Sequence, residues 1–275
     1  MTKRTPNVRG ALLDELEYMK YSGEEVGVLL SAGVDSCSVL FACMELGLPT
    51  TAYSFTLDTH ESRDFKYARD TANILGVDFE PVILPTDLDH LKKFMNYAVT
   101  IGCRSKTDFE CSWPMIYAMR QMTADGIGHI LSATSADSHF CLSKKANMHY
   151  KDKVDLYRNI VFSKRNTGQK MIMRREATKL GATYLTPYDS TRMSSELYGY
   201  TWDELNKPKQ KQPVRDSFPE YFDRIKVANH TNLQLGDSGI ADHFKILLQD
   251  KEWNPGGKFK AVKGVYNELL RRHGV

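Results

Sequence analysis

The sequence predicts an α/β protein with a parallel, five-stranded sheet and helices on both faces, followed by a mostly helical C-terminal region. The main observation is an alternation that continues along the chain to about residue 190. Short apolar runs, typical of strands buried on both faces, alternate with longer segments whose apolar residues recur at helical spacing. This order gives a parallel sheet, because each helix carries the chain back across one face of the sheet.

The composition is that of a globular protein. Hydrophobic residues make up 41% of the 275 residues and charged residues 26%. No apolar run approaches the roughly 20 residues of a membrane helix, and the N-terminal residues lack the apolar core of a secretion signal. The net charge of +3 is too small to indicate nucleic-acid binding, although it leaves a nucleic-acid or nucleotide substrate open.

Cysteine and histidine usage indicates a reduced, cytoplasmic protein without a structural metal site. The five cysteines include no CxxC pair, which argues against disulfides and a structural zinc ion. The eight histidines show no ligand spacing, and most are expected to be solvated.

The first strand is expected at residues 26–30 and the first helix at residues 36–46, where Gly47 and Pro49 end it. The later elements of the same alternation are strands at 51–55, 79–84, 127–131 and 183–185, and helices at 63–75, 88–99, 114–122 and 169–180. A polar loop is expected at 102–112, with Pro114 opening the helix that follows.

The pattern changes beyond about residue 190, where several short helical pieces replace the strand and helix alternation. We therefore expect an α/β domain over residues 1–190 that holds the ligand. A helical region over residues 191–275 would complete the site.

The most informative segment joins the first strand to the first helix and reads Leu30-Ser31-Ala32-Gly33-Val34-Asp35-Ser36. Small residues let backbone N–H groups close on phosphate oxygens, and the following helix points its positive end at them. Ser31 and Ser36 add hydroxyl donors. A carboxylate beside phosphates is suited to bind Mg²⁺, which is the role expected for Asp35. The alternative is an ordinary turn in which a serine caps the helix.

This segment resembles the S-G-G-x-D-S signature of the PP-loop ATP pyrophosphatases, in an adenine nucleotide alpha hydrolase-like fold. Those enzymes cleave ATP between the α and β phosphates and adenylate a substrate oxygen. The resemblance implies ATP and Mg²⁺ as cofactors, and a nucleotide site formed by Leu30, Ser31, Ala32, Gly33, Asp35, Ser36 and Phe55. Ala32 replaces the first glycine of the pair and is expected to add a methyl group where backbone meets phosphate.

A second segment, residues 131–140, resembles the L-S-G-x-G-x-D-E-L-F element of asparagine synthetase and β-lactam synthetase, with Ser132, Asp137 and Phe140 in register. The resemblance implies that Asp137 is the second carboxylate on Mg²⁺. It also implies that Ser132 and Ala133 lie near the nucleotide and Thr134 near the substrate. The alternative is a polar loop with a capping aspartate.

A third segment, Lys211 to Phe218, resembles the K-x-x-L-R-x-x-F element of the same branch. In that branch the lysine stabilises negative charge during acyl transfer, a role that the resemblance gives to Lys211. Arg215 would orient a phosphate or the helix that carries Lys211. The alternative is a solvated basic patch.

Three further residues are weaker candidates for binding the substrate. Asp189 ends a segment similar to R-x-P-F-L-D of asparagine synthetases, and it is equally suited to cap the next helix. Arg104 and Lys106 lie in the expected loop at 102–112, from which they could meet a substrate carboxylate. Surface charge is the alternative for these two.

Together these resemblances imply an ATP-dependent, AMP-forming ligase of the asparagine synthetase kind. A small-molecule carboxylate would be adenylated, and ammonia or an amine would then displace AMP. Only about 25 residues precede the first strand, so we expect no N-terminal glutaminase domain and a nitrogen source that is free ammonia, an amine or a separate glutaminase.

Two rival interpretations remain open. The first is a PP-loop enzyme that modifies a nucleobase, a nucleotide or tRNA, although the absence of CxxC pairs argues against the thiolating and zinc-bearing members. The second is a catalytically inactive nucleotide-binding protein. It is suggested by three departures from the signatures: Ala32, Ser135 and Ser138.

Overall fold

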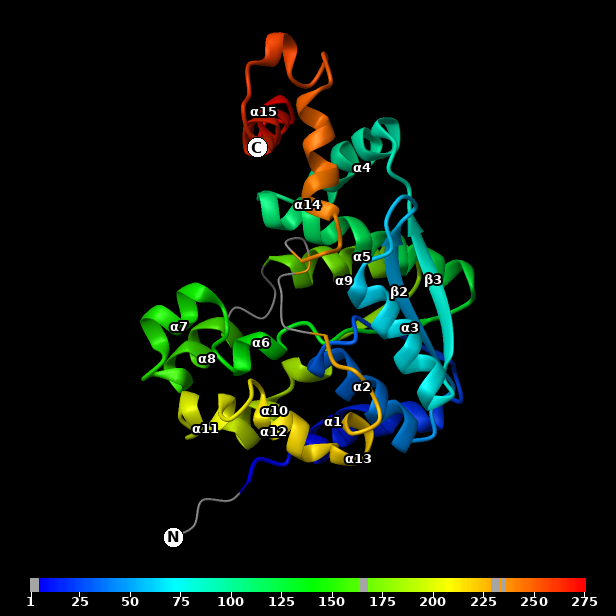
Figure 1. Ribbon diagram of the computed structural model, residues 1–275, viewed down its shortest axis with the longest axis vertical. Coiled ribbons are helices and arrows are strands. Elements are labelled where there is room, and N and C mark those ends of the chain that lie inside the picture. Colours follow the sequence, from blue (N-terminus) through cyan, green and yellow to red (C-terminus); the bar gives the residue numbers. More distant parts are fainter. Residues whose placement is uncertain (1–4, 164–167, 229–232, 234–235) are drawn as a thin grey trace.

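The computed structural model describes residues 5–163, 168–228, 233 and 236–275. Its centre is a five-stranded sheet in the order β3-β2-β1-β4-β5, and every pair of neighbouring strands is parallel (Figure 1). The strands are β1 (Val26–Leu29), β2 (Thr50–Leu57), β3 (Asp78–Leu84), β4 (His129–Leu131) and β5 (Thr183–Leu185). The predicted fold class is therefore confirmed.

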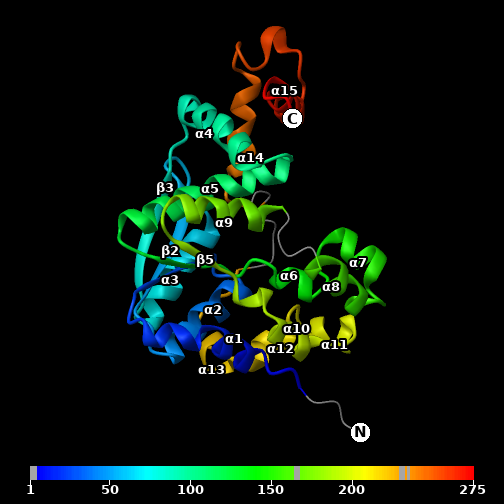
Figure 2. The same cartoon turned by 180° about the vertical axis from the view of Figure 1, so that it is seen from behind.

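Helices cover both faces of the sheet, as predicted (Figures 1 and 2). One face carries α2 and α3, and the other carries α5 and α9. The helices of this part are α1 (Val8–Leu16), α2 (Val34–Glu45), α3 (Arg63–Leu75), α4 (Leu88–Ile101), α5 (Lys106–Ala124), α6 (Ala136–His139), α7 (Lys144–Tyr150), α8 (Val154–Phe162) and α9 (Gln169–Lys179). Because helices shield both faces, the inner strands carry apolar residues on both sides.

The region after residue 190 is helical and packs against two different parts of the sheet layer. Its helices are α10 (Thr191–Leu197), α11 (Trp202–Asn206), α12 (Gln212–Ser217), α13 (Pro219–Phe222), α14 (Ile240–His243) and α15 (Val262–Arg272). Phe218 joins the core around α1 and α2, whereas Phe244 and Tyr266 join the core around α4 and α5. The domain boundary at residue 190 stays a prediction.

Helix α5 begins much earlier than the sequence indicated. Its N-terminus is fixed by a capping box, in which Ser105 Oγ accepts from the Asp108 N–H at 3.2 Å and Asp108 Oδ2 accepts from the Ser105 N–H at 2.9 Å. Pro114 therefore lies inside the helix, and the loop expected at 102–112 ends before Lys106. The proline was a misleading start signal because the capping box precedes it.

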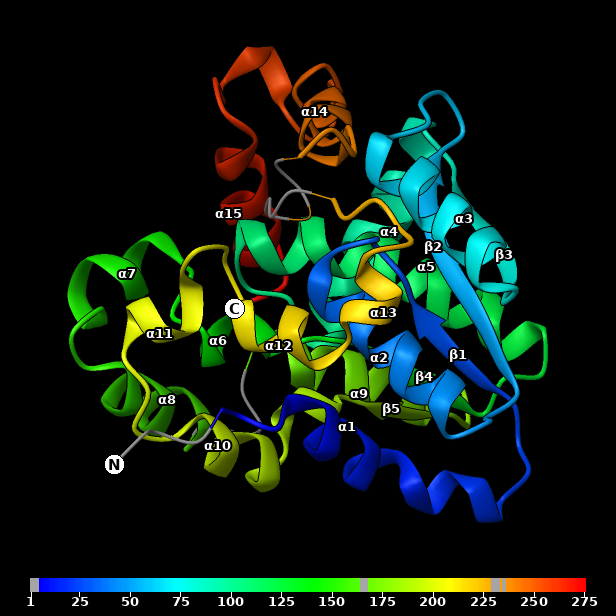
Figure 3. The same ribbon diagram turned by 60° about the horizontal axis from the view of Figure 1, so that its bottom comes forward.

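Helix α1 was not predicted, although Val8, Ala11, Leu12 and Leu16 recur at helical spacing, because the first 21 residues were judged only as a polar, charged segment without a secretion signal. It lies against α2, α10 and α12 (Figure 3). Val8, Ala11 and Leu12 are fully buried in this contact. The N-terminal helix therefore closes one side of the core that supports the β1–α2 connection.

We expect Leu12→Ala to lower the free energy of unfolding by about 2–5 kcal/mol, because it opens a cavity in a closed core. Urea denaturation followed by circular dichroism measures the change. Tyr18→Ala is the control: this side chain is 54% exposed, and its loss should change stability by less than about 0.5 kcal/mol. Equal effects for the two variants would show that α1 does not pack as described.

Candidate functional site

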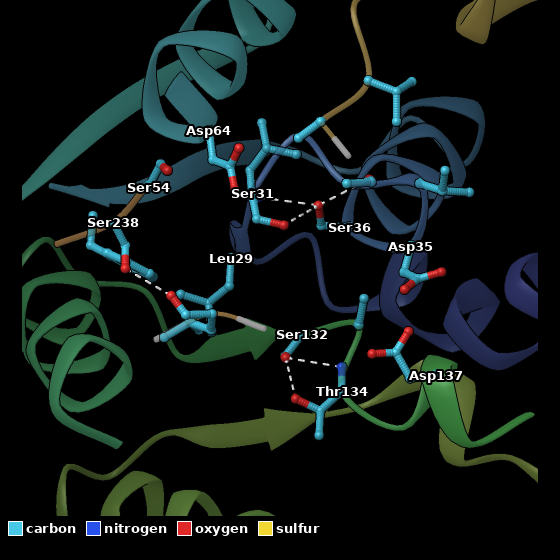
Figure 4. A pocket seen from close by; sticks show the side chains of 18 of the residues that line it. Leu29, Ser31, Asp35, Ser36, Ser54, Asp64, Ser132, Thr134, Asp137 and Ser238 are labelled. Carbon is cyan, nitrogen blue, oxygen red and sulfur yellow. Dashed lines mark hydrogen bonds between the residues drawn. The ribbon is translucent and has the colours of Figure 1, made fainter. Parts of the chain in front are cut away.

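A cavity of about 870 Å³ lies beyond the carboxyl ends of β1, β2 and β4 (Figure 4). Residues from the N-terminal turns of α2, α3, α5 and α9 surround it. Among the described residues, further wall comes from the C-terminal region, through Lys209, Gln210, Lys211, Arg215, Val227, Ala228, Leu233 and Ser238. In an open parallel sheet this edge is where ligands bind, because the loops there diverge and the helix N-termini point inward. The volume is in the upper part of the range that is usual for ligand sites.

Most of the predicted site residues meet in this cavity. Those that line it are Leu30, Ser31, Gly33, Asp35, Ser36, Phe55, Ser132, Ala133, Thr134, Asp137, Lys211 and Arg215. They come from positions up to 185 residues apart in the chain (215 − 30). The structure thus brings together the three segments that resemble enzyme signatures.

The β1–α2 connection forms a compact, hydroxyl-lined turn. Ser36 Oγ accepts from the Ser31 N–H at 3.1 Å, lies 3.1 Å from Ser31 Oγ and donates to the Gly33 carbonyl at 3.2 Å. No side chain caps the N-terminus of α2, whose N-cap residue is Gly33. The N–H groups of its first turn are therefore suited to bind an anion that enters the cavity.

Ala32 differs from the sequence expectation. Its side chain is fully buried in the hydrophobic core and does not line the cavity, so the extra methyl group points away from the place expected for phosphate. Its φ of 53° lies in the left-handed region that favours glycine. The carbonyl of Ala32 accepts from the Ala228 N–H at 2.8 Å, which ties the loop to the C-terminal wall.

Asp35 and Asp137 face each other across the edge of the cavity (Figure 4). Asp35 lies in the first turn of α2 and Asp137 in the first turn of α6. The Lys211 ammonium binds both: Nζ lies 2.6 Å from Asp137 Oδ1 and forms a short ion pair with Asp35 Oδ2. Burial opposes charge on Lys211, whose side chain is 5% exposed, but the two carboxylates outweigh this and raise its pKa.

The carboxylate pair fits a magnesium ion that also binds phosphate. Two carboxylates already converge on one cation, and their oxygens are the ligands that Mg²⁺ prefers. Among the described residues, no group of three or more His, Cys, Asp or Glu side chains could hold a metal. Asp35 and Asp137 would therefore hold the ion together with water and phosphate oxygens, the usual arrangement for Mg²⁺ at a nucleotide.

The sequence did not indicate two walls of the cavity. Ser54 lies in the middle of β2, just past the register position of Leu29 at the end of β1, and Ser62 and Asp64 lie at the start of α3. Burial, and next the charge of Asp237, raise the pKa of Asp64. The sequence signal that could have identified this wall is Ser62, a serine directly before the predicted helix. In the structure Ser62 is the N-cap of α3, and its Oγ accepts from the Phe65 N–H at 3.1 Å.

The other wall comes from α5 and α9, through Thr107, Cys111, Met115 and Gln169. Thr107 and Cys111 were missed because residues 102–112 were expected to be a loop. Met115 and Gln169 lie in predicted helices, but the sequence does not show how those helices pack against the cavity. Burial raises the pKa of the Cys111 thiol to about 12, so at neutral pH this sulfur is protonated and a poor nucleophile.

Three weaker candidates lie outside the cavity lining. The Arg104 guanidinium donates to the Val99 and Cys103 carbonyls, both at 2.8 Å, at the end of α4. Lys106 pairs with the buried Glu110 in α5. Asp189 accepts from Lys170 at 2.8 Å in an ion pair with α9. The structure does not bring these three to the other site residues: Arg104 and Lys106 are held by groups close in sequence, and Asp189 is held by α9.

Comparison with known proteins decides the family. The model of the asparagine synthase family matches residues 7–243, which include the whole sheet and all three signature-like segments. The chain belongs to the asparagine synthase family. No curated protein matches the chain.

Among solved structures, this asparagine synthase family chain is similar to two archaeal proteins. One is described as a predicted subunit of tRNA methyltransferase from Methanocaldococcus jannaschii, with 15% identity over 78% of this chain and 97% of that one, and a TM-score of 0.34. The other is the U34-tRNA thiolase NcsA from Methanococcus maripaludis with its [4Fe-4S] cluster, with 12% identity over 96% and 80% and a TM-score of 0.42. These scores are too low to carry a functional argument.

Membership of the asparagine synthase family makes this chain a PP-loop protein of the ATP pyrophosphatase kind. ATP use, usually with Mg²⁺, is general in that superfamily. No helix among the described residues has the length and apolar character to cross a membrane.

We expect Ala32→Gly to leave the affinity for a non-hydrolysable ATP analogue within about twofold, because the methyl group lies in the core. Stability should change by less than about 1 kcal/mol, since relief of the left-handed conformation offsets the lost methyl burial and the added chain flexibility. Isothermal titration calorimetry and urea denaturation measure the two quantities.

Gly33→Ala is the matched control, because Gly33 lines the cavity and an added Cβ would lie 3.3 Å from Ser31 Oγ. It should weaken binding about tenfold, the equivalent of one lost phosphate hydrogen bond. Much tighter binding by Ala32→Gly would contradict the buried placement of the methyl group.

Proposed function

We propose that this chain is an ATP-dependent, AMP-forming carbon–nitrogen ligase. The proposal rests on one observation: the β1–α2 turn, two carboxylates and a buried lysine meet at one cavity. The turn with Asp35 resembles the PP-loop signature, and the segments that hold Asp137 and Lys211 resemble the ligase branch. Its substrates are a small-molecule carboxylate and either ammonia or an amine. Free ammonia or a separate glutaminase would supply the nitrogen where the substrate is ammonia.

The first task of the site is to hold the triphosphate. The N-terminal turn of α2 and the hydroxyls of Ser31 and Ser36 would bind the β and γ phosphates through N–H and O–H donors. Asp35 and Asp137 would hold Mg²⁺. The ion would neutralise the negative charge that develops on the departing pyrophosphate. Ser132 and Ala133, at the end of β4, line the cavity next to the carboxylate pair and would contact the nucleotide.

The reaction has two steps. An oxygen of the substrate carboxylate attacks the α-phosphorus, a new P–O bond forms, and the bond to the β-phosphate oxygen breaks to release pyrophosphate. The amine nitrogen then attacks the acyl carbon and loses a proton, and the C–O bond to AMP breaks. Lys211 is the cation placed to stabilise the oxyanion of the second step, and positioning supplies much of the remaining rate gain.

Enzymes that modify a nucleobase or tRNA are the rival within the superfamily. The sequence has no CxxC pair, which argues against the thiolating and zinc-bearing members of the superfamily. The segment that holds Lys211 and Arg215 resembles the ligase branch and favours the ligase.

We expect the protein to exchange radioactive pyrophosphate into ATP in the presence of Mg²⁺ and one member of a panel of carboxylic acids. Asp35→Asn should lower that exchange about 100-fold or more, because it removes a charge that holds the metal at the leaving group. Asp216→Asn, on the exposed face of α12, is the control and should exchange at the wild-type rate. Circular dichroism checks that both variants are folded.

Two results would reject the ligase. Exchange that appears only with a nucleobase or tRNA would assign the chain to the modifying enzymes. Absence of AMP formation with every acid, together with equal ATP affinity with and without Mg²⁺, would assign it to inactive nucleotide-binding proteins.

A further inference from the structure

We propose that Lys211 is an exchangeable internal cation: in the metal-free protein its ammonium occupies the place of the divalent ion between Asp35 and Asp137, and metal binding releases it toward the substrate side of the cavity. The inference rests on the proposed function in taking these two aspartates as the metal ligands. It adds that one side chain has two positions, and that loading the metal moves it from one to the other.

The first step is that a cation is required between the two aspartates in either state. Asp35 and Asp137 face each other, and their side chains are 16% and 48% exposed. Two facing carboxylates at the edge of a partly buried cavity repel each other unless a positive charge lies between them. The Lys211 ammonium supplies that charge, within bonding distance of one oxygen of each carboxylate.

The second step is that a divalent ion and the ammonium cannot share this position. Mg²⁺ binds carboxylate oxygens at about 2.0–2.1 Å. The Lys211 nitrogen already lies 2.6 Å from Asp137 Oδ1 and close to Asp35 Oδ2. An ion bound to the same two oxygens would place a double positive charge almost on top of the ammonium, so the ammonium must move.

The third step is that only the side chain has to move. The Lys211 backbone N–H donates to Asn206 Oδ1 at 3.2 Å, and Asn206 Nδ2 in turn donates to the Phe140 carbonyl at 3.0 Å. The backbone is thus fixed at the start of α12, whereas the four-carbon stem of a lysine has rotatable bonds that let the ammonium change position. Lys211 also lines the cavity, so its ammonium has an open direction in which to turn.

Exchange of this kind couples two events. In the absence of metal the lysine is neutralised by the aspartates and withheld from the substrate. When metal arrives, the same cation becomes available to a negative acyl or phosphate oxygen. Because the displaced ammonium needs a new partner, metal alone should bind weakly, and the charges of the triphosphate should strengthen its binding.

The test measures Mn²⁺ binding to the full-length, nucleotide-free protein by the electron paramagnetic resonance signal of free Mn²⁺. Lys211→Met should bind Mn²⁺ about tenfold or more tightly than the wild type, because the competing charge is gone. Lys209→Met is the matched control. It removes an equal charge from an exposed lysine that also lines the cavity two positions away, and it should change the affinity by less than about threefold. Equal affinity of Lys211→Met and the wild type, or no Mn²⁺ binding by either, would overturn the inference.

A second measurement uses the wild-type protein and remains decisive if Lys211→Met does not fold. Acetylation by an amine-reactive ester, read by peptide mass spectrometry, should modify Lys211 several-fold faster when Mn²⁺ is saturating, whereas labelling of Lys209 stays constant. Labelling of Lys211 that does not respond to Mn²⁺ would show a static ion pair. Neither measurement involves ATP or turnover, so a chain that passes both and yet shows no ligase activity would lose only the proposed function.

Discussion

One buried ammonium holds together three segments that are far apart in the chain. Lys211 comes from the turn before α12, Asp35 from the first turn of α2 and Asp137 from the first turn of α6. Each carboxylate would otherwise face the other across the cavity edge, and the lysine would otherwise be a charge buried in a core with no compensation. The position of the C-terminal region relative to the sheet therefore depends on the same charges that define the site.

The support for this ion triad extends outward through backbone contacts. Asn206 accepts from the Lys211 N–H and donates to the Phe140 carbonyl just after α6, so one amide side chain joins the segments that hold Lys211 and Asp137. On the opposite side, the Ala228 N–H binds the Ala32 carbonyl and holds the C-terminal wall against the β1–α2 turn. These contacts fix the backbone on two sides of the ion triad.

Local sequence patterns predicted much of the fold and part of the candidate site. The alternation of apolar runs and amphipathic segments predicted all five strands, and the turn from Ser31 to Ser36 was found because its residues are contiguous. The walls from α5 and α9 were missed, since their contact with the cavity depends on how a crossover helix packs. Most histidines were expected to be solvated, but His139 is fully buried, and burial lowers its pKa to about 3. Its Nε2 lies 2.6 Å from the Tyr188 carbonyl, 49 positions away in the chain. Sequence spacing carries no information on such a contact.

The departures from the glycine-containing signatures bear on whether the site is intact. Ala32 and Ser135 stand where the resembling signatures have glycine, and both keep a positive φ, 53° and 85° respectively. Lys211 joins them at 59°. A non-glycine residue in this conformation costs about 1–2 kcal/mol, and it persists only where the surrounding contacts determine the backbone path. Ala32 and Ser135 thus adopt a backbone conformation that glycine favours, at two positions where the signatures have glycine. The two replacements therefore do not by themselves indicate that the turns have lost the shape that the signatures need.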